Sequence, residues 1–363
     1  MVAMQRGCKA RAAQGGFVLA ATLWILAGIA IAVAMMMVWT HAQVADAQRM
    51  RLQVEDRMAI HDTRNVVLYL VSTRPQTYAG FPVDLLSEER KALRRLDDFG
   101  AFVRDPVGGE MRADGTVYRG SGETFFSIQD ESGLFPLVNP DPRSLDAFLR
   151  LMGVPEEQIP RLRDTFMDYV DEDSLVRLNG AEGVEYRRAG RMPPADRRLA
   201  SPVELKRIMG WDTLDPSLLE RMSNLVTPYY TGAWNLNTAP RELLPLALPG
   251  CEAFCDRLVE RRVQEPWRNG SQLQAAMGAE LAGDAATDYR FTSDDALRLT
   301  FWGRTGSAIR VHVALENVAG QTGPWSVVAA YPVPRPDIDE PAQSTASTFL
   351  ANPGAASTQR DGN

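Results

Sequence analysis

The sequence has few of the residues on which most enzyme active sites depend, with three histidines and three cysteines among 363 residues. His41 and His61 stand in a long helical stretch, and His312 stands in a strand-like run. There is no G-x-S-x-G, H-E-x-x-H or phosphate-binding P-loop motif. Carboxylates are abundant, but no pair is marked out as a general acid and base. We therefore expect a protein that binds other molecules rather than one that catalyses a reaction.

Basic charge is also scarce outside the N-terminus. Residues 1–16 hold three basic residues and no acid, so they contribute +3 to a formal net charge of −7. Removing that +3 leaves −10 on the rest of the chain. A body this acidic repels nucleic acid and anionic lipid surfaces.

One long apolar run follows this basic segment. Residues 17–39, FVLAATLWILAGIAIAVAMMMVW, contain no charged residue. As a helix they would span about 35 Å, against about 30 Å of bilayer hydrocarbon. A cleaved secretory signal has a shorter apolar core followed by a small-x-small site, which is absent after this run. The charge asymmetry predicts a single-pass anchor with a cytoplasmic N-terminus. The alternative is a buried core helix.

The junction between the basic segment and the apolar run is more specific. Residues 15–19, GGFVL, resemble the class III signal of type IV pilins and pseudopilins, which a prepilin peptidase cuts after the glycine. The resemblance implies cleavage between Gly16 and Phe17, with Phe17 as the N-methylated terminus. Most pilin-like subunits carry Glu as the fifth mature residue, whereas this chain has Ala21. Among pseudopilins, this absence points to the K subunit of type II secretion.

Helical and strand-like patterns alternate along the rest of the chain. Residues 40–72 lack Pro and Gly and repeat apolar residues every three or four positions, which predicts a stalk helix. Residues 87–97 predict a helix with Ser87 as N-cap, and residues 116–118 and 124–129 predict short strands. Residues 130–133 predict a turn.

This order predicts an α+β fold, in which an all-α domain is inserted into a small antiparallel sheet. With the junction, it resembles a pseudopilin fold. The expected divisions are 1–16 prepilin leader, 17–39 transmembrane helix, 40–72 periplasmic stalk helix, 73–138 first α+β part, 139–283 inserted helical domain, 284–333 second group of strands and 334–363 disordered tail.

An acidic loop lies within the predicted helical domain. Its candidate oxygen donors are Asp168, Asp171, Asp173, Asn179 and Glu182. Calcium binds six to eight such oxygens on flexible backbone. The spacing is not that of an EF-hand, so the residues alone favour a solvated acidic loop. However, the pattern D-[YW]-[VI]-D-x-D followed by N-G-A-E resembles the signature of the K family. That resemblance implies a structural calcium site on this loop.

A second motif, WNLNTAPRELLPLALPG, covers residues 234–250. Asn237 or Thr238 is expected to cap a helix that begins at residues 239–240, where Pro is tolerated. The following Pro-Gly turn leads into a second helix, which gives a helix-hairpin-helix (SAM-like) element. The segment resembles the N-[LIV]-N-T-A signature of K pseudopilins and the DNA-binding hairpins of competence proteins. Its net charge is zero over residues 235–263 and its turn has one glycine, which favours a scaffold over DNA binding.

The cysteines leave two alternatives. Cys8 lies in the leader, whereas Cys251 and Cys255 are four positions apart at a predicted helix start. An oxidising compartment would allow them to form a disulfide, although this spacing is awkward in a regular helix. Otherwise they are two free, partly buried thiols. Zinc is less favoured because no second ligand pair is nearby.

Taken together, residues 14–333 resemble the minor pseudopilin K family of type II secretion. The resemblance implies a protein of the bacterial inner membrane whose bulk is periplasmic, at the tip of the pseudopilus, where it initiates assembly and supports export of folded proteins. The implied partners are the minor pseudopilins I and J, through them H and the major pseudopilin, and the prepilin peptidase, with no nucleic acid. The alternative is a membrane-tethered DNA-uptake or type IV pilus assembly protein that binds DNA through its hairpin.

Overall fold

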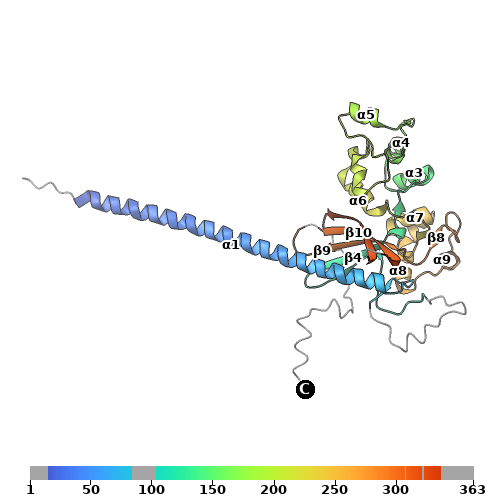
Figure 1. The fold of residues 1–363 in the computed structure, drawn as a ribbon, viewed down its shortest axis with the longest axis horizontal. Coiled ribbons are helices and arrows are strands. Elements are labelled where there is room, and N and C mark those ends of the chain that lie inside the picture. Colours follow the sequence, from blue (N-terminus) through green and yellow to red (C-terminus); the bar gives the residue numbers. More distant parts are fainter. Residues whose placement is uncertain (1–14, 84–103, 307, 321–322, 337–363) are drawn as a thin grey trace, which may run out of the picture. The chain divides into compact units, whose positions relative to one another are not determined.

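The computed structural model describes residues 15–83, 104–306, 308–320 and 323–336. It divides into two units, residues 1–55 and residues 56–363. One helix, α1 (Gly15–Thr73), begins in the first unit and ends in the second (Figure 1). The predicted transmembrane and stalk helices are therefore a single helix without a break. The predicted helix at residues 87–97, the leader before residue 15 and the tail after residue 336 lie outside the described residues.

Residues 17–39 of α1, within the first unit, carry no charged side chain on any side of the helix. Among the described residues, this is the helix that is long and apolar enough to cross a membrane. None of its most apolar window is buried in the protein, and Trp24 is 80% exposed. The alternative of a buried core helix is therefore wrong. A helix that is apolar all round and uncovered by protein fits a lipid environment.

The second unit is built on an antiparallel sheet with the strand order β11-β10-β9-β4-β3. Strand β4 precedes most of the helices in sequence and β9 follows them, yet the two are neighbours, with Phe126 opposite Phe301 (Figure 1). The chain that leaves the sheet after β4 therefore returns beside it. The strands are β3 (Asp114–Arg119), β4 (Phe125–Asp130), β9 (Ala296–Trp302), β10 (Ala308–Gly320) and β11 (Gly323–Val333).

The C-terminal turns of α1 pack on one face of this sheet. Val67 and Leu70 are fully buried there against Phe126, Ile128 and Leu299. Each fully buried side chain of this size contributes about 1.5–3 kcal/mol of hydrophobic stabilisation. A short strand pair, β1 (Phe81–Pro82) with β2 (Glu110–Met111), extends the same core.

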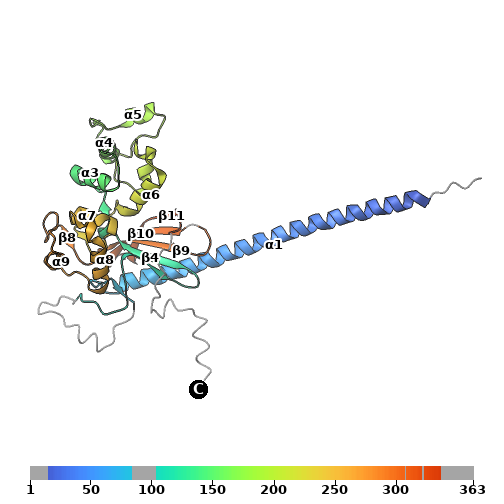
Figure 2. The same cartoon turned by 180° about the vertical axis from the view of Figure 1, so that it is seen from behind.

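The helices between β4 and β9 form two groups, each with its own hydrophobic core, that meet at α3 (Pro142–Leu151) and α7 (Leu244–Ala247) (Figures 1 and 2). The first group packs around Phe148, Phe166 and Trp211. Asp141 and Asp215 cap two of its helices by accepting hydrogen bonds from backbone amides, and a proline follows each cap. The group consists of α3 (Pro142–Leu151), α4 (Ile159–Val170), α5 (Gly183–Arg188), α6 (Pro216–Leu225) and the 3-10 turns η2 (Pro202–Arg207) and η3 (Trp211–Thr213).

The second group packs around Leu236, Leu258 and Trp267. It consists of η4 (Arg241–Leu243), α7 (Leu244–Ala247), η5 (Cys251–Ala253), α8 (Cys255–Gln264) and α9 (Gly270–Met277). The helical region is not purely α, because it also contains two short parallel strand pairs. These are β5 (Phe135–Pro136) with β6 (Val226–Thr227), and β7 (Trp234–Asn235) with β8 (Tyr289–Arg290).

Candidate functional site

The acidic loop joins the end of α4 to the start of α5, and its carboxylates gather beneath it. Asp168 is fully buried in the last turn of α4, Asp171 is the residue at which that helix ends, and Glu182 precedes α5. Burial, together with the negative charges of Asp168, Asp171 and Asp196, raises the pKa of Glu182 to about 7. Burial likewise raises the pKa of Asp168 and of Asp171. We call Asp168, Asp171, Glu182 and Asp196 the acidic cluster.

Two of the predicted ligands, Asp173 and Asn179, have hydrogen-bond partners of their own. Asp173 accepts a hydrogen bond from the backbone amide of Leu175 at 2.8 Å. Asn179 donates from its side chain to Asp164 Oδ2 at 2.9 Å and from its backbone amide to the same oxygen at 3.2 Å. Both side chains are therefore engaged in shaping the loop.

Asp196 was missed by the sequence analysis. It stands 14 positions beyond Glu182 and belongs to no recognisable motif. Its backbone has a left-handed conformation, with φ of 49°, which Asp tolerates better than most residues. Its amide donates to the carbonyl of Tyr169 at 3.2 Å, which anchors this segment next to the end of α4. Spacing alone carried no signal for it.

The cluster carries more acceptor oxygens than the protein has donors for. Asp168 Oδ1, both Asp171 carboxylate oxygens and Glu182 Oε1 are buried without a hydrogen bond. Gly180 lies so close that a Cβ there would overlap Asp168 Oδ2, which explains why the loop needs glycine at this position. Orphaned buried carboxylate oxygens are costly unless a cation or donor satisfies them. As a donor set they suit a hard cation such as calcium.

The positive charge beside the cluster comes from Arg177. Its guanidinium lies 3.6 Å from Asp168 Oδ1 and 3.3 Å from Asp171 Oδ2. Within the described part of the chain, no three His, Cys, Asp or Glu side chains are arranged to hold a metal ion as they stand. These carboxylate oxygens are therefore of the kind that binds calcium, but in this structure two of the carboxylates pair with the guanidinium of Arg177. The calcium site stays a prediction.

A second polar site lies where the chain leaves the sheet. Asp130, fully buried at the end of β4, accepts hydrogen bonds from the backbone and hydroxyl of Ser132 at 3.0 and 2.6 Å. It also accepts from Asn235 Nδ2 at 2.7 Å, from Thr238 Oγ1 at 2.9 Å and from the amide of Asp294 at 3.2 Å. Burial raises its pKa to about 6. The predicted turn at residues 130–133 is thus a buried 3-10 turn, η1 (Glu131–Gly133). We call Asp130 and the residues that donate to it, Ser132, Asn235, Thr238 and Asp294, the polar joint.

Asn237 adjoins the polar joint. Its side chain donates to the carbonyls of Trp267 and Phe291, both at 2.8 Å, and accepts from the amide of Trp267 at 2.9 Å. The expectation that Asn237 or Thr238 caps a helix is wrong. The first turn begins at Arg241, after Pro240, and has no side-chain cap. The N-L-N-T-A segment is largely buried, and its side chains form hydrogen bonds to elements that are distant in sequence.

Buried charges extend the joint across the sheet. Glu131 accepts from His312 Nδ1 at 2.5 Å and lies 3.5 Å from Arg298 Nε. Arg298 donates to the carbonyls of Asn224, at 2.7 Å, and Val226. Burial lowers the pKa of His312, whereas the charge of Arg298 lowers the pKa of Glu131 despite its burial. Strands β9 and β10 are thereby tied to the end of α6.

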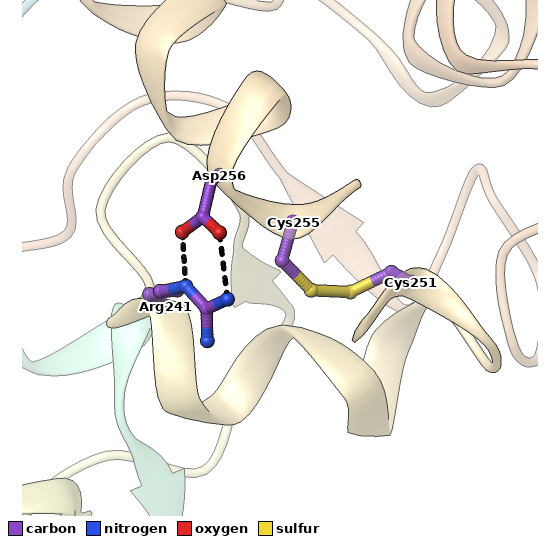
Figure 3. Close-up of a disulfide and its surroundings, with 4 residues drawn as sticks. All are labelled: Arg241, Cys251, Cys255 and Asp256. Carbon is purple, nitrogen blue, oxygen red and sulfur yellow. Dashed lines mark hydrogen bonds and ion pairs between the residues drawn. A yellow bond between two sulfur atoms is a disulfide. The ribbon is translucent and has the colours of Figure 1, made fainter. Parts of the chain in front are cut away.

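Two of the four arginines at residues 235–263, Arg241 and Arg262, are engaged in contacts within the protein. Arg241 makes a bidentate ion pair with Asp256, in which Nε donates to Oδ1 and Nη2 donates to Oδ2 at 2.8 Å (Figure 3). Arg262 is buried and donates to the carbonyls of Leu236 and Ala239, both at 2.8 Å. Phosphate recognition needs basic groups that reach outward. The guanidinium groups of Arg241 and Arg262 instead bond to other groups of the same chain.

The structure joins Cys251 and Cys255 in a disulfide (Figure 3). Their Cα atoms are 5.1 Å apart and both side chains are fully buried. The geometry is possible because the chain is not a regular helix here: η5 ends at Ala253, and α8 begins at Cys255 itself. With the sulfurs bonded to each other, neither is a thiolate for zinc.

Comparisons with known proteins agree on one family. Residues 130–229 match the family model described as type II secretion system protein K. A type II secretion system protein K from Dickeya chrysanthemi is 30% identical over 142 residues, which are 35% of this chain and 37% of that protein. The match thus covers little more than a third of the relative's length. The resemblance to the K family that the sequence indicated is confirmed for residues 130–229.

A solved structure also matches. It is the crystal structure of the GspK–GspI–GspJ complex of the type II secretion system from enterotoxigenic Escherichia coli. The match has a TM-score of 0.47 and 16% sequence identity, and covers 81% of this chain and 99% of the solved chain.

Proposed function

We propose that this chain, whose residues 130–229 are those of a type II secretion system protein K, acts as a minor pseudopilin at the tip of the secretion pseudopilus. The observation that carries this proposal is the family match, because its segment contains the whole acidic cluster and begins at Asp130 of the polar joint. A membrane-spanning helix precedes that segment in the same chain. In this role the chain initiates pseudopilus assembly and supports export of folded proteins.

The proposal includes a processed, single-pass anchor. Prepilin peptidase cleaves after Gly16, and Phe17 becomes the N-methylated terminus of α1. The N-terminus faces the cytoplasm, and residues 56–363 lie in the periplasm. Support comes from the basic charge before the apolar run and the acidic charge after it. The disulfide between Cys251 and Cys255 also suits an oxidising compartment.

The proposed partners are the minor pseudopilins I and J. The solved Escherichia coli protein is found with GspI and GspJ, and the same assembly is proposed here, with H and the major pseudopilin joined through it. Two features of this chain agree with a terminal position. Ala21 offers no carboxylate to a neighbouring subunit, and the helices between β4 and β9 add bulk that would hinder a further subunit.

We further propose that the acidic cluster holds a structural calcium ion. Asp168, Asp171 and Glu182 supply the orphaned oxygens, and Asp196 adds charge. Such an ion ties the end of α4 to the start of α5. Asp173 and Asn179 are left out of this ligand set because their side chains already bond the amide of Leu175 and the carboxylate of Asp164.

Co-purification tests the assembly. The full-length chain, affinity-tagged and extracted in detergent, is co-expressed with the I and J pseudopilins of the same organism, and separately with its major pseudopilin alone. We expect I and J to elute with the chain in a stable complex, and the major pseudopilin alone not to. Elution without I and J would contradict the proposal. Salt-sensitive DNA binding at micromolar concentration would instead favour the DNA-uptake alternative.

A further inference from the structure

Arg177 holds an unusual position, because it is the basic residue of a loop whose other side chains are mostly acidic or apolar. In the described part of the chain, the ion pairs that reach Asp168 and Asp171 come from Arg177. Its neighbours Val176 and Leu178 are exposed, Leu178 by 96%. Its guanidinium therefore turns back to the cluster while the side chains on either side face solvent.

The guanidinium is held loosely. Its side chain is 41% exposed, and its distances of 3.3 and 3.6 Å to the two carboxylates are ion-pair distances without a hydrogen bond, since Asp168 Oδ1 and Asp171 Oδ2 remain without a donor. The backbone is anchored separately, because the amide of Arg177 donates to Asp168 Oδ2 at 3.1 Å. The guanidinium can thus leave the cluster while the loop backbone stays bonded.

We propose that Arg177 is a built-in counter-ion that competes with a divalent cation for Asp168 and Asp171. This inference rests on the proposed calcium site and adds the residue that sets its affinity. Without the cation, the guanidinium neutralises part of the cluster and keeps the loop folded. With the cation, the same charge repels the ion and must move aside. Arg177 therefore stabilises the cation-free head and weakens cation binding by the same interaction.

The size of the effect follows from the two ion pairs. A partly exposed pair changes an equilibrium constant by a factor of about 1.4 to 5. Loss of both pairs therefore tightens cation binding by about two- to thirtyfold, with a central expectation of about tenfold. If Arg177 instead helps to build the site, its removal weakens binding. The two roles are separated by the direction of the change.

Calcium titration of the full-length chain in detergent tests this. Wild type, Arg177→Gln and the control Arg188→Gln are stripped with chelator and titrated calorimetrically with calcium chloride at low ionic strength. Arg188 is matched in charge, with a 78% exposed side chain that lies 3.9 Å from Glu185 rather than in the cluster. We expect Arg177→Gln to bind calcium about tenfold more tightly than Arg188→Gln, which should match wild type. Its cation-free thermal midpoint should be lower and should rise further on calcium addition.

Arg177→Lys covers the possibility that Arg177→Gln does not fold without calcium, since it keeps the charge and should bind calcium within twofold of wild type. Equal or weaker binding by Arg177→Gln than by Arg188→Gln would overturn the counter-ion role and leave the calcium site standing. Absence of binding to wild type and all variants would overturn both. Either result is independent of co-purification with I and J.

Discussion

Replacing Asp130 with alanine is the sharpest test of the polar joint. The carboxylate accepts five hydrogen bonds from η1, from the N-L-N-T-A segment and from the amide of Asp294 just before β9. Alanine removes both carboxylate oxygens at once. The donors Asn235 Nδ2 and Thr238 Oγ1 then stay buried but lose the oxygen to which they donate. A buried donor left unsatisfied costs about 1–3 kcal/mol. We expect Asp130→Ala to lower the free energy of unfolding by about 2–4 kcal/mol at neutral pH.

The effect should depend on pH in a defined direction. Burial raises the pKa of Asp130 from 3.8 to about 6, so the folded state binds a proton more tightly than the unfolded state. The stabilisation from this proton is complete below pH 3.8 and is lost as the pH rises through 6. A shift of this size corresponds to about 3 kcal/mol. Because the alanine variant lacks this term, the difference from wild type should be larger at pH 4.5 than at pH 7.5.

Urea unfolding of the full-length chain, followed by tryptophan fluorescence at both pH values, measures this. Asp130→Asn is the matched control, since its remaining oxygen can keep the two backbone amides and the hydroxyls of Ser132 and Thr238 can rotate. We expect Asp130→Asn to cost less than Asp130→Ala at both pH values. A cost below about 1 kcal/mol for the alanine variant, or one that grows with pH, would refute the reasoning.

Three further results are expected. Gly180→Ala should lower the thermal midpoint, at a cost of about 1–3 kcal/mol, because the new methyl group overlaps the Asp168 carboxylate; an unchanged midpoint would contradict this close approach. Replacing Cys251 and Cys255 together with serine, or reducing the disulfide, should lower the free energy of unfolding by about 2 kcal/mol, the value for a loop of about five residues; equal stability with and without reductant would count against a formed disulfide. Burial lowers the pKa of His312, so the contribution of His312 to stability should fall as the pH drops below 6.5, opposite to that of Asp130; in urea titrations the stability difference between wild type and His312→Gln should therefore shrink from pH 7 to pH 5, and a constant difference would contradict this.

The features that the sequence predicted best are those set by local chemistry. The run at residues 17–39 lacks charge, so its apolar and uncovered helix follows from composition alone. The strand expected at residues 116–118 is present as β3, which is three residues longer, and the strand expected at residues 124–129 is present as β4, shifted by one residue. Alternating side chains and flanking glycines are local signals, which a single sequence carries.

The features that were missed depend on contacts distant in sequence. Asn237 looked like a helix cap because it precedes a proline, but the groups it bonds, Trp267 and Phe291, are 30 and 54 positions away. Asp196 joined the cluster through the fold of the chain rather than through spacing. Residue type predicts that a polar group needs a partner, but not which partner it finds.

The joint explains how a large helical region can be carried by a small sheet. The helical region is connected to the sheet by two segments of the chain, one that follows β4 and one that precedes β9. Two connecting segments alone would allow the region to rotate relative to the sheet. Asp130 bonds both segments, because it ends β4 and accepts a hydrogen bond from the amide of Asp294 on the second. Arg298 then reaches from β9 to the carbonyls at the end of α6. Hydrogen bonds are directional, so a buried network of this kind selects one orientation where apolar contacts would tolerate several. Variants that break the joint should therefore change the placement of the helical region on the sheet before they unfold either part.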